Sequence, residues 1–294
     1  MTKAALITGV TGFIGGKLAL RLIEEGWAVH AVVRPTSAES RLPVGVVPHP
    51  HDGSVAGLTA IVRAAKPDVV FHLASLYLAD HRPDQVDALV QSNILFPAQL
   101  VEAMLANDVR RLLNTGTGWQ HYRAIGYDPV NLYAATKQAC ADLLRFYQDA
   151  HGLSVVTLKI FDTYGTSDTR RKLVQLLVDA ALSGDTLGMS AGDQIIDLTH
   201  VDDVVGAFVI AANRLLASDV ALDEEFFVSG ERLRLRELVA QVGTILDRPV
   251  DAEFGARPYR AREVMRPVEP PATLPGWQPR ITLREGVATL ATLG

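Results

Sequence analysis

Hydrophobic residues in the first half of the chain form short, uninterrupted runs that alternate with longer segments of helical periodicity. The short runs predict five strands, at residues 4–8, 27–33, 68–74, 110–114 and 153–161. Most of them are apolar on both faces, which is typical of a parallel sheet that is covered by helices on both sides. Helical spacing is clearest in residues 17–26 and at the apolar positions Val86, Leu89, Val90, Ile94, Leu100, Val101 and Met104. This alternation predicts a doubly wound α/β fold.

The alternation loosens after about residue 164, and residues 257–280 are rich in Pro and Arg. Such a composition is typical of irregular segments. We therefore predict a large domain over residues 1–164, to which residues 196–222 return, and a smaller domain over residues 165–294.

Composition narrows the classes of protein to consider. The chain has 294 residues, of which 48% are hydrophobic and 21% charged, and these values are ordinary for a globular protein. A net charge of −5 without a basic run argues against nucleic acid or an anionic membrane as the main partner. The single cysteine, Cys140, excludes an internal disulfide and fits a small buried hydrophobic side chain in a reducing compartment. No apolar stretch reaches about 18 residues and the first residues lack signal-peptide features, so we expect a cytoplasmic protein.

A glycine-rich stretch, "TGVTGFIGG", follows the first predicted strand and precedes a predicted amphipathic helix. Gly9, Gly12 and Gly15 would allow a tight turn, a close approach to a pyrophosphate and close packing of the helix on the sheet. The helix N-terminus would then offer free N–H groups to phosphates. The placement predicts dinucleotide binding, although the spacing is Gly-x-x-Gly-x-x-Gly and not the Gly-x-Gly-x-x-Gly of many dehydrogenases.

Five motifs occur in an order that is found in one known superfamily. They are "TGVTGFIG" at the start, "FHLAS" (71–75), "YAATK" (133–137), "THVDDVV" (199–205) and "LPGWQPRITLREGV" (274–287). Together they resemble the extended short-chain dehydrogenase/reductase superfamily, and within it the branch of nucleotide-sugar epimerases, dehydratases and ketoreductases. The resemblance spans the whole chain. It implies a parallel Rossmann sheet that binds a nicotinamide dinucleotide, followed by a smaller C-terminal substrate-binding domain.

Tyr133 and Lys137 stand four residues apart, so on a helix their side chains are neighbours. The resemblance implies that Tyr133 is the general acid/base and that Lys137 holds the cofactor ribose and lowers the pKa of Tyr133. A free phenol titrates near ~10, and moving its pKa towards 7 needs about 4 kcal/mol of preferential stabilisation of the phenolate. The resemblance also implies a hydroxyl that binds the substrate oxygen. Alignment at the end of the fifth strand places Thr115 there, with Thr117 as the second candidate.

Two departures from the family bear on the reaction and on the cofactor. Dehydratases of this branch carry Asp-Glu directly after the catalytic hydroxyl, where this chain has Gly116 and Thr117, so we expect hydride transfer without elimination of water. NAD-preferring folds place an acidic residue at the end of the second strand, where this chain has Arg34, with Arg41 seven residues further on. A cation at this position suits a 2′-phosphate and favours NADP(H), with NAD(H) as the second choice.

The resemblance implies further cofactor contacts from the glycine-rich turn and from the ends of the following strands. Asp52 would meet the adenine amine, and Asn93 either contacts the cofactor or braces the active-site backbone. His49 and His51 closely precede Asp52, but no Cys or further close His completes a tetrahedral set of ligands, so we predict no metal site. The predicted cofactor contacts are Gly9, Thr11, Gly12, Phe13, Ile14, Arg34, Arg41, Asp52, Gly53, Leu73, Ala74, Ser75, Asn93, Tyr133, Lys137 and Ile160.

Substrate contacts depend on less regular motifs. Relatives end their sixth strand near Arg-x-Phe-Asn-x-Tyr-Gly-Pro, whereas this chain reads "LKIFDTYGT" (158–166), with Asp162 in place of Asn. An aspartate repels a diphosphate unless it contacts sugar hydroxyls or is neutralised. "YRAREV" (259–264) resembles the segment whose Arg binds the diphosphate, which implies this role for Arg260, with Arg170 and Arg171 as weaker candidates. The predicted substrate contacts are Thr115, Thr117, Asp162, Arg171 and Arg260.

These observations predict an NADPH-dependent reductase of a keto group, with C4 as the first choice, on a nucleoside-diphosphate deoxysugar. The alternatives are an NAD-dependent nucleotide-sugar epimerase and a cofactor-binding protein that performs no chemistry. The sequence leaves open the nucleotide base (CDP, dTDP, UDP or GDP), the deoxygenation pattern and the stereochemistry of the alcohol. A two-fold homodimer is also predicted, because the helices with Asn93 and with the Tyr-Lys pair carry apolar side chains in excess: Leu100, Met104, Leu143, Leu144 and Tyr147.

Overall fold

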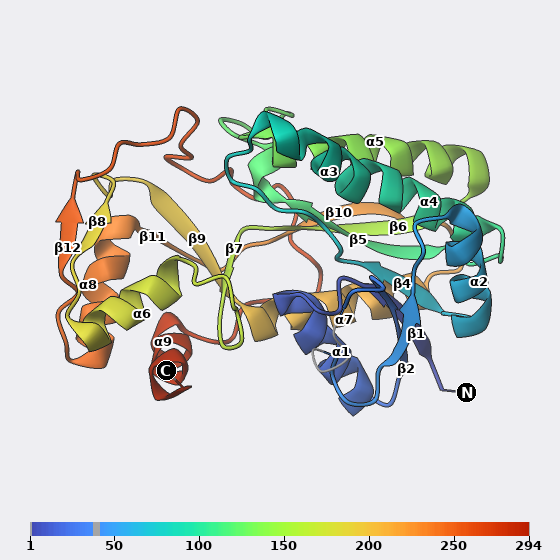
Figure 1. Ribbon diagram of the computed structural model, residues 1–294, viewed down its shortest axis with the longest axis horizontal. Helices are drawn as coiled ribbons and strands as arrows, with labels where there is room; N and C mark the ends of the chain where they lie inside the picture. Colours follow the sequence, from blue (N-terminus) through green and yellow to red (C-terminus); the bar gives the residue numbers. More distant parts are fainter. Residues whose placement is uncertain (1, 38–41, 294) are drawn as a thin grey trace.

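The computed structural model of the protein describes residues 2–37 and 42–293, and its centre is a seven-stranded parallel sheet (Figure 1). In spatial order the strands are β10 (Asp223–Val228), β6 (Ser154–Ile160), β5 (Arg111–Thr117), β4 (Val69–His72), β1 (Ala4–Thr8), β2 (Ala28–Val33) and β3 (Val47–Pro50). The order reverses at β1, as in a doubly wound sheet. The predicted fold class is therefore confirmed, and each of the five predicted strands is present.

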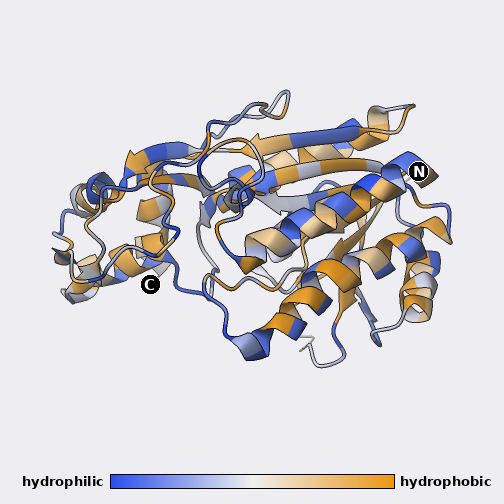
Figure 2. Cartoon of the chain, turned by 90° about the horizontal axis from the view of Figure 1, so that it is seen from above, coloured by the Kyte–Doolittle hydropathy of each residue, from blue (hydrophilic) through white to orange (hydrophobic). Residues whose placement is uncertain are grey.

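Helices cover both faces of this sheet (Figure 1). One face carries α1 (Phe13–Glu24) and α7 (Val201–Ala217), and the other carries α2 (Val55–Ala65), α4 (Phe96–Leu105) and α5 (Leu132–His151). Each face has its own hydrophobic cluster, centred on Phe71 and Phe208 on one side and on Leu100 and Met104 on the other. Figure 2 shows mostly apolar strands beneath helices that are banded apolar and polar.

The helical run Pro83–Leu105 contains α3 (Val86–Val90), the π-helical turn η3 (Gln91–Leu95) and α4. By length and composition alone this run could cross a membrane. Its side chains Leu100, Val101 and Met104 are fully buried in the cluster shared with α2 and α5. The apolar character of the run is thus explained by its place in the core.

A second region lies beyond the carboxyl ends of the main strands, at the left of Figure 1. Its small sheet has the order β11-β9-β7, with β9 parallel to β7 and antiparallel to β11, and β8 pairs with β12 beside it. Three helices pack on these strands around a third hydrophobic cluster. The elements are β7 (Asp162–Tyr164), α6 (Leu173–Ser183), β8 (Leu187–Met189), β9 (Ile195–His200), β11 (Glu231–Arg234), α8 (Leu235–Leu246), β12 (Ala252–Phe254) and α9 (Leu283–Leu293).

The chain crosses between the two regions more than once. After β9 it returns to the main sheet, where α7 packs against α1 and β10 pairs with β6. Thus α7 lies within the predicted return at 196–222, and β10, whose sequence "DEEFFV" begins with three acids, extends the return further. The hydrophobic pattern did not predict β10, because its first half lacks apolar residues.

The surface argument for a homodimer is wrong for most of the side chains on which it rested. Leu100 and Met104 are 0% exposed, and Leu144 and Tyr147 are 3% and 7% exposed, because α2, α4 and α5 pack on one another within the subunit. The apolar side chains that α3, η3 and α5 do leave exposed are Val90, Leu95 and Phe146. Pairing of two copies through these helices stays a prediction.

Candidate active site

The glycine-rich turn joins β1 to α1 with almost no free space. Gly9 has a φ of +79°, and a Cβ there would lie 2.7 Å from the Ala74 backbone nitrogen. At Gly15 a Cβ would lie 2.2 Å from the Gly9 carbonyl oxygen, so only glycine allows this approach of helix and turn. Gly12 caps α1 without any side-chain hydrogen bond, which leaves the first N–H groups of the helix free, as a pyrophosphate requires.

Buried polar contacts fix the loop after β4 against this turn. The Thr8 hydroxyl contacts His72 Nδ1 at 2.9 Å and accepts a hydrogen bond from the Ala74 N–H at 3.1 Å. His72 is 1% exposed, and burial, with Lys137 adding to it, lowers the pKa of His72 to about 3. Leu73, Ala74 and Ser75 therefore follow β4 directly beside the glycines, at the predicted cofactor edge.

The ends of β2 and β3 carry the residues predicted to meet the adenosine half of the cofactor. Arg34 follows β2, is exposed, and pairs with no carboxylate among the described residues, whereas Arg41 lies outside the described residues. The Asp52 carboxylate accepts hydrogen bonds from the N–H and hydroxyl of Ser54 at 2.9 and 2.7 Å. His49 contacts His30 at 2.9 Å, and within residues 2–37 and 42–293 no three His, Cys, Asp or Glu side chains gather as a metal site would need.

Tyr133 and Lys137 lie in the first two turns of α5, which begins after the N-cap residue Asn131. Lys137 is 4% exposed, and its ammonium group makes no hydrogen bond or ion pair with any described residue. Such a buried, unpaired cation fits the role of binding a cofactor hydroxyl. Cys140, on the same helix, is 2% exposed and burial raises its pKa, as expected of a small buried hydrophobic side chain.

The pKa of Tyr133 differs from what the resemblance implied. Burial raises it well above its ordinary value and the neighbouring Tyr77 adds to this, while the nearby Ser75 hydroxyl and the charge of Arg170 lower it. Lys137 is not among the groups that lower it. In this structure Tyr133 is a protonated phenol at neutral pH, which suits a proton donor.

Asn93 braces the backbone around these residues. It lies in the π-helical turn η3 and is 2% exposed. Its amide oxygen accepts from Leu76 N–H at 2.8 Å and from Ser75 Oγ at 3.1 Å, and its amide nitrogen donates to Leu76 O at 3.0 Å and Thr136 Oγ1 at 2.9 Å. Since a carboxamide has two donors and two acceptor sites, all are in use. Of the two roles predicted for Asn93, positioning is therefore the one that its contacts support.

The two threonine candidates differ in what their hydroxyl groups can still do. Thr115 donates its only hydroxyl proton to the His72 carbonyl oxygen at 2.8 Å. Thr117, two residues closer to the carboxyl end of β5, accepts from Trp119 N–H at 3.3 Å, and among the described residues its own proton has no acceptor. These contacts favour Thr117 over Thr115 as a donor to a substrate oxygen.

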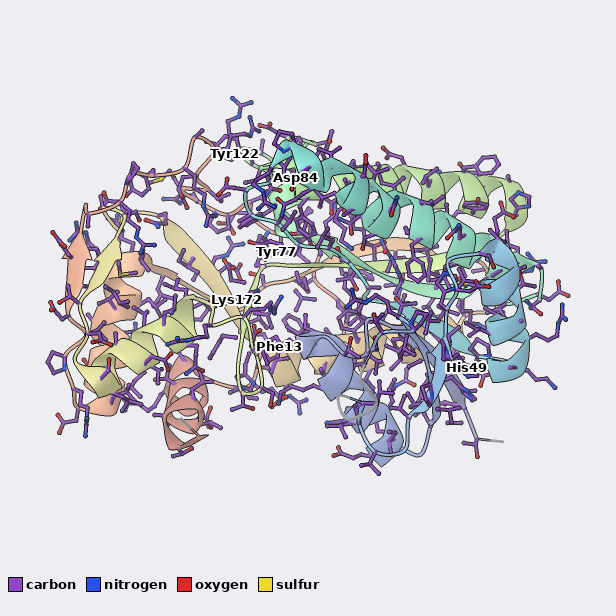
Figure 3. All side chains as sticks on the ribbon, in the orientation of Figure 1. Phe13, His49, Tyr77, Asp84, Tyr122 and Lys172 are labelled. Carbon is purple, nitrogen blue, oxygen red and sulfur yellow. The ribbon has the colours of Figure 1, made fainter. Side chains whose placement is uncertain are left out.

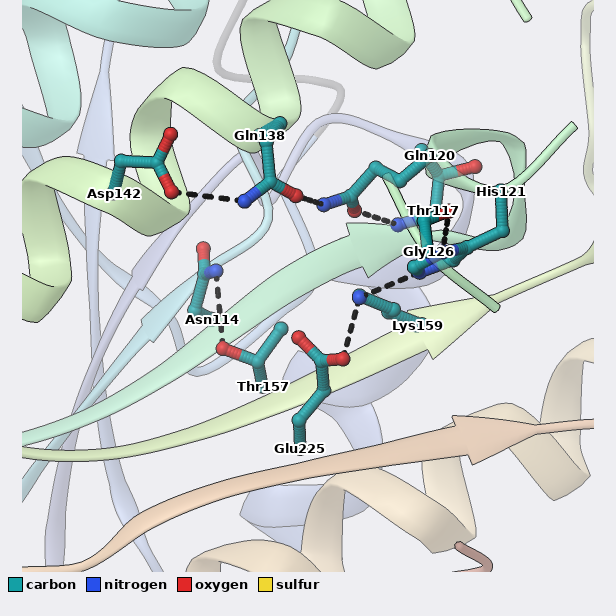
Figure 4. A network of polar contacts seen from close by, with 10 residues as sticks. All are labelled: Asn114, Thr117, Gln120, His121, Gly126, Gln138, Asp142, Thr157, Lys159 and Glu225. Atoms are coloured by element: carbon teal, nitrogen blue, oxygen red, sulfur yellow. Dashed lines mark hydrogen bonds and ion pairs between the residues drawn. The ribbon is translucent and has the colours of Figure 1, made fainter. Parts of the chain in front are cut away.

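An amide relay connects Thr117 to the helix of Tyr133 (Figure 4). Gln120 accepts from the Thr117 N–H at 3.0 Å and donates to Gln138 at 2.8 Å, and Gln138 in turn donates to Asp142 at 2.9 Å. Gln138 directly follows Lys137, so the relay holds the end of β5 against α5. Beside it, the buried Lys159 ammonium contacts His121 Nε2 at 2.8 Å and pairs with Glu225.

A cavity of about 580 Å³ opens next to this centre, between the carboxyl ends of the main strands and the second region. Aromatic rings of Tyr77, Trp119, Phe161 and Tyr164 form much of its wall. Tyr77 also packs edge-on against Tyr133 with 5.0 Å between ring centroids, so it connects the cavity to the catalytic candidate. Tyr133 is thus separated from the cavity by the ring of Tyr77.

Six cationic side chains line the cavity: Arg170, Arg171, Lys172, Arg257, Arg260 and Arg262. Three are already paired, because Arg170 binds Asp168, Arg171 binds Asp179 at 2.6 Å and Arg262 binds Asp128. The remaining three, Lys172, Arg257 and Arg260, form no ion pair with the part of the chain that the structure describes. Arg260 thus remains a candidate for a phosphate, whereas Arg171, 67% exposed and held by Asp179, is a weaker one.

Sequence reasoning missed Tyr77 and Lys172. Tyr77 follows "FHLAS" by two residues and Lys172 directly follows the predicted Arg171, but neither belongs to a motif. The Lys172 ammonium lies 5.8 Å from the centroid of the Tyr77 ring, and Arg260 lies 5.9 Å from that of Trp119. Two unpaired cations are therefore held on neighbouring aromatic rings, since Tyr77 and Trp119 are themselves 5.7 Å apart.

The chain is similar in sequence and in fold to proteins of one known family. Residues 5–221 match the family model described as the NAD dependent epimerase/dehydratase family. The chain is 25% identical to CDP-abequose synthase of Yersinia pseudotuberculosis over 265 residues, with 89% of this chain and 90% of that protein covered. It is 27% identical to UDP-glucose 4-epimerase of Mycolicibacterium smegmatis over 319 residues, with 96% of each covered. Among solved structures, MoeE5 in complex with UDP-glucose and NAD aligns with a TM-score of 0.79 and 26% identity over 98% of this chain and 97% of that one.

Proposed function

The chain belongs to the NAD-dependent epimerase/dehydratase family, and from this premise we propose that it reduces a keto group, with C4 as the first choice, on a nucleoside-diphosphate deoxysugar at the expense of NADPH. As a member of the family it is a nucleotide-sugar-modifying enzyme of the extended short-chain dehydrogenase/reductase type with a nicotinamide dinucleotide cofactor. The observation that carries the reductase assignment is Arg34, an exposed cation at the end of β2, because a cation there suits the 2′-phosphate of NADPH and a net reductase commonly consumes NADPH, whereas an epimerase usually keeps NAD. The similarity to CDP-abequose synthase supports a deoxysugar substrate.

The residues of the amino-terminal half fit the dinucleotide. Gly9 and Gly15 leave the space that a Cβ would fill, and the uncapped start of α1 offers N–H groups to the pyrophosphate. Lys137 would hold the nicotinamide ribose, and Arg34 would bind a 2′-phosphate, which is why NADPH is the proposed cofactor. When bound, the cofactor supplies the hydride.

Tyr133 would donate its phenolic proton to the carbonyl oxygen as the carbonyl carbon is reduced. A hydroxyl donor beside it would stabilise the negative charge that develops on this oxygen. We assign this second role to Thr117, because the proton of Thr115 is committed to the His72 carbonyl. Replacing Thr117 by Val should therefore slow turnover more than replacing Thr115 by Val.

The rest of the substrate would lie in the cavity. Arg260, unpaired and held over Trp119, would bind the diphosphate, and Arg257 lies on the same segment. The walls of Tyr77, Trp119 and Phe161 offer apolar faces on which a sugar or base can pack.

Single-turnover oxidation of NADPH with a 4-keto nucleotide sugar tests this proposal. We expect Tyr133→Phe to bind NADPH normally and to slow the reaction by ~10² or more, the usual scale of general acid catalysis. Tyr127→Phe is the matched control, because Tyr127 is 54% exposed on a loop and should react at the wild-type rate. A Tyr133→Phe enzyme that reduces the substrate as fast as the wild type would remove Tyr133 from the mechanism.

An NAD-dependent epimerase is the second candidate function, favoured by the similarity to UDP-glucose 4-epimerase over 96% of both chains. The two functions differ in their use of cofactor. A reductase consumes one equivalent of NADPH for each product, whereas an epimerase returns its cofactor to the starting state. Interconversion of two nucleotide sugars without net change in cofactor redox state would decide for the epimerase.

A further inference from the structure

Two charged side chains of opposite sign face the cavity without a partner. Asp162 is the first residue of β7, and Lys172 is the residue before the first turn of α6. Both line the cavity, and neither side chain makes a hydrogen bond or an ion pair with any residue in the described ranges. The cavity therefore offers a free carboxylate and a free ammonium group to whatever occupies it.

The two groups line the same cavity and do not form an ion pair with each other. Burial raises the pKa of Asp162, and Lys172 is the first of the charges that lower it. Burial lowers the pKa of Lys172 and the charge of Arg170 lowers it further, while Asp162 is the first of the charges that raise it. Since no ion pair joins them, a gap remains between the carboxylate and the ammonium group.

This gap lies at the reacting end of the cavity. The Lys172 ammonium is 5.8 Å from the Tyr77 ring centroid, and the Tyr77 ring is 5.0 Å from that of Tyr133. Figure 3 places Tyr77 and Lys172 together, between the main sheet and the second region. Arg260, by contrast, lies over Trp119. Lys172 is thus on the ring that contacts Tyr133, and Arg260 is on the neighbouring ring, while the charge of Arg260 also lowers the pKa of Asp162.

The chemistry of the pair selects one kind of ligand group. A carboxylate only accepts hydrogen bonds and an ammonium group only donates them. A carbonyl or ether oxygen could satisfy Lys172 alone, and an amine cation could satisfy Asp162 alone. A hydroxyl group satisfies both at once, because it donates through its proton and accepts through its lone pairs.

We propose that Asp162 and Lys172 together bind one hydroxyl group of the sugar, close to the carbon that Tyr133 serves, and so select substrates that retain this hydroxyl. The inference rests on the proposed function only in taking a nucleoside-diphosphate sugar as the ligand. It makes the pair a specificity determinant distinct from the diphosphate contacts. It also explains how a carboxylate is tolerated in a cavity that would receive a diphosphate, since Asp162 would face the sugar.

The test is a binding experiment with stable nucleoside-diphosphate hexoses, which does not require turnover. The base is chosen first, as the one of CDP, UDP, dTDP and GDP that most raises the melting temperature in the presence of NADP⁺. Dissociation constants are then measured by calorimetry for the hexose derivative, for its monodeoxy analogues one position at a time, and for the bare nucleoside diphosphate. The proteins are the wild type, Asp162→Ala, Lys172→Met, the double variant and Arg260→Met.

We expect one monodeoxy analogue to bind the wild type roughly 10- to 100-fold more weakly than the parent sugar, the scale of a lost hydrogen bond to a charged group. Each single variant should bind the parent sugar as weakly as that analogue, and the double variant should lose no more. The bare nucleoside diphosphate should bind these variants as it binds the wild type, and only Arg260→Met should weaken it. Asp162→Asn should restore part of the selectivity, because an amide oxygen still accepts a hydrogen bond.

Two results would overturn the inference. One is a Lys172→Met variant that binds the bare nucleoside diphosphate as poorly as the sugar, which would make Lys172 a phosphate ligand. The other is a wild type that binds every monodeoxy analogue as tightly as the parent. Failure of the proposed function has a different signature: no keto sugar is reduced, while selection for the hydroxyl persists in the binding data.

Discussion

At the amino-terminal end of the site, the groups offered to a ligand belong mainly to the backbone, and the polar side chains of Thr8, His72 and Asn93 behind them are buried and hydrogen-bonded. Gly9 and Gly15 leave room by having no side chain. The Thr8 hydroxyl contacts His72 and the Ala74 N–H, and the Asn93 amide is used by Ser75, Leu76 and Thr136. At the cavity end the ligand meets charged and aromatic side chains from irregular segments. There the useful groups are those without an ion-pair partner among the described residues, such as Lys172 and Arg260.

The contrast separates two ways of building specificity. A cofactor common to a whole family can be bound by a turn whose shape tolerates almost no substitution. A substrate that differs between relatives is bound by side chains that change without disturbing the sheet. Substitutions in the glycine-rich turn should therefore damage fold and cofactor binding together, and those of exposed or cavity-lining side chains should change affinity alone.

Gly15→Ala should have the largest effect on stability and cofactor affinity, and it tests the glycine-rich turn. Its Cβ would lie 2.2 Å from the backbone oxygen of Gly9, so turn and helix must move apart. Overpacking of this kind costs up to about 3 kcal/mol of folding stability. If the turn relieves the strain by moving out of the geometry that binds the cofactor, the affinity for NADPH should fall by ~10². NADPH titration and urea unfolding measure both quantities. Gly206→Ala on α7, where a Cβ meets nothing within 4 Å, is the control and should gain up to about 1 kcal/mol. A Gly15→Ala protein with unchanged cofactor affinity would break the comparison.

The stability of the protein should depend on pH because His72, beside the glycine-rich turn, is buried. His72 has a pKa of about 3 when folded, below the usual value of ~6.5 that it takes on unfolding. The unfolded chain therefore binds a proton that the folded chain does not, and stability falls as the pH drops below ~6.5. The slope from this residue approaches about 1.4 kcal/mol per pH unit. Urea unfolding at several pH values measures it, and His72→Asn should show a shallower dependence. Parallel curves for the two proteins would contradict the assignment.

Arg34→Asp should alter cofactor choice without altering the fold. Removing a charge-assisted contact to a 2′-phosphate and adding a repulsive carboxylate should reduce the preference for NADPH over NADH by about tenfold or reverse it. Dissociation constants for both cofactors provide the ratio. Arg63→Asp, an exposed substitution on α2, should leave the ratio unchanged. Equal constants for NADPH and NADH in the wild type would remove the role of Arg34.

The smallest loss of affinity is expected at Arg171. Comparing it with Arg260 tests whether paired and unpaired cations of the cavity differ. Arg171 is paired with Asp179 and 67% exposed, so Arg171→Met should change nucleotide-sugar affinity by less than about threefold. Arg260→Met, which removes an unpaired cation, should weaken it by about tenfold or more. Calorimetry with the same ligand compares the two. Equal losses of affinity in the two variants would mean that an ion pair does not keep a cavity cation from binding the ligand.

The sequence predicted the sheet and the cofactor turn because both depend on local patterns. Apolar runs at residues 4–8 and 68–74 predicted buried strands because they are short and apolar on both faces, and the glycines predicted a dinucleotide turn because they directly follow the first strand. The hydrophobic pattern did not predict the strand β10, because its acidic residues lie at the sheet edge, where polar side chains remain solvated.

What could not be predicted depends on contacts between distant segments. Leu100 and Met104 show the helical spacing of a buried face, but a pattern does not say whether the covering surface is α2 of the same subunit or another copy. Arg171 and Lys172 are adjacent in sequence, and only the folded chain gives Arg171 a partner in Asp179 and leaves Lys172 over Tyr77. The choice between Thr115 and Thr117 likewise depends on the His72 carbonyl, which belongs to another strand.

The return of the chain to the main sheet through α7 and β10 has a consequence for how the protein is made. During synthesis the edge of β6 stays open until residue 228 has emerged, after β7, β8 and β9 of the second region. Until then the buried Lys159 lacks its partner Glu225, and a row of β6 backbone groups is available to other chains. A fragment that ends near residue 164 would keep this open edge permanently and should aggregate. The main sheet is therefore complete only after β7, β8 and β9 have been synthesised, so the two regions form in an interleaved order.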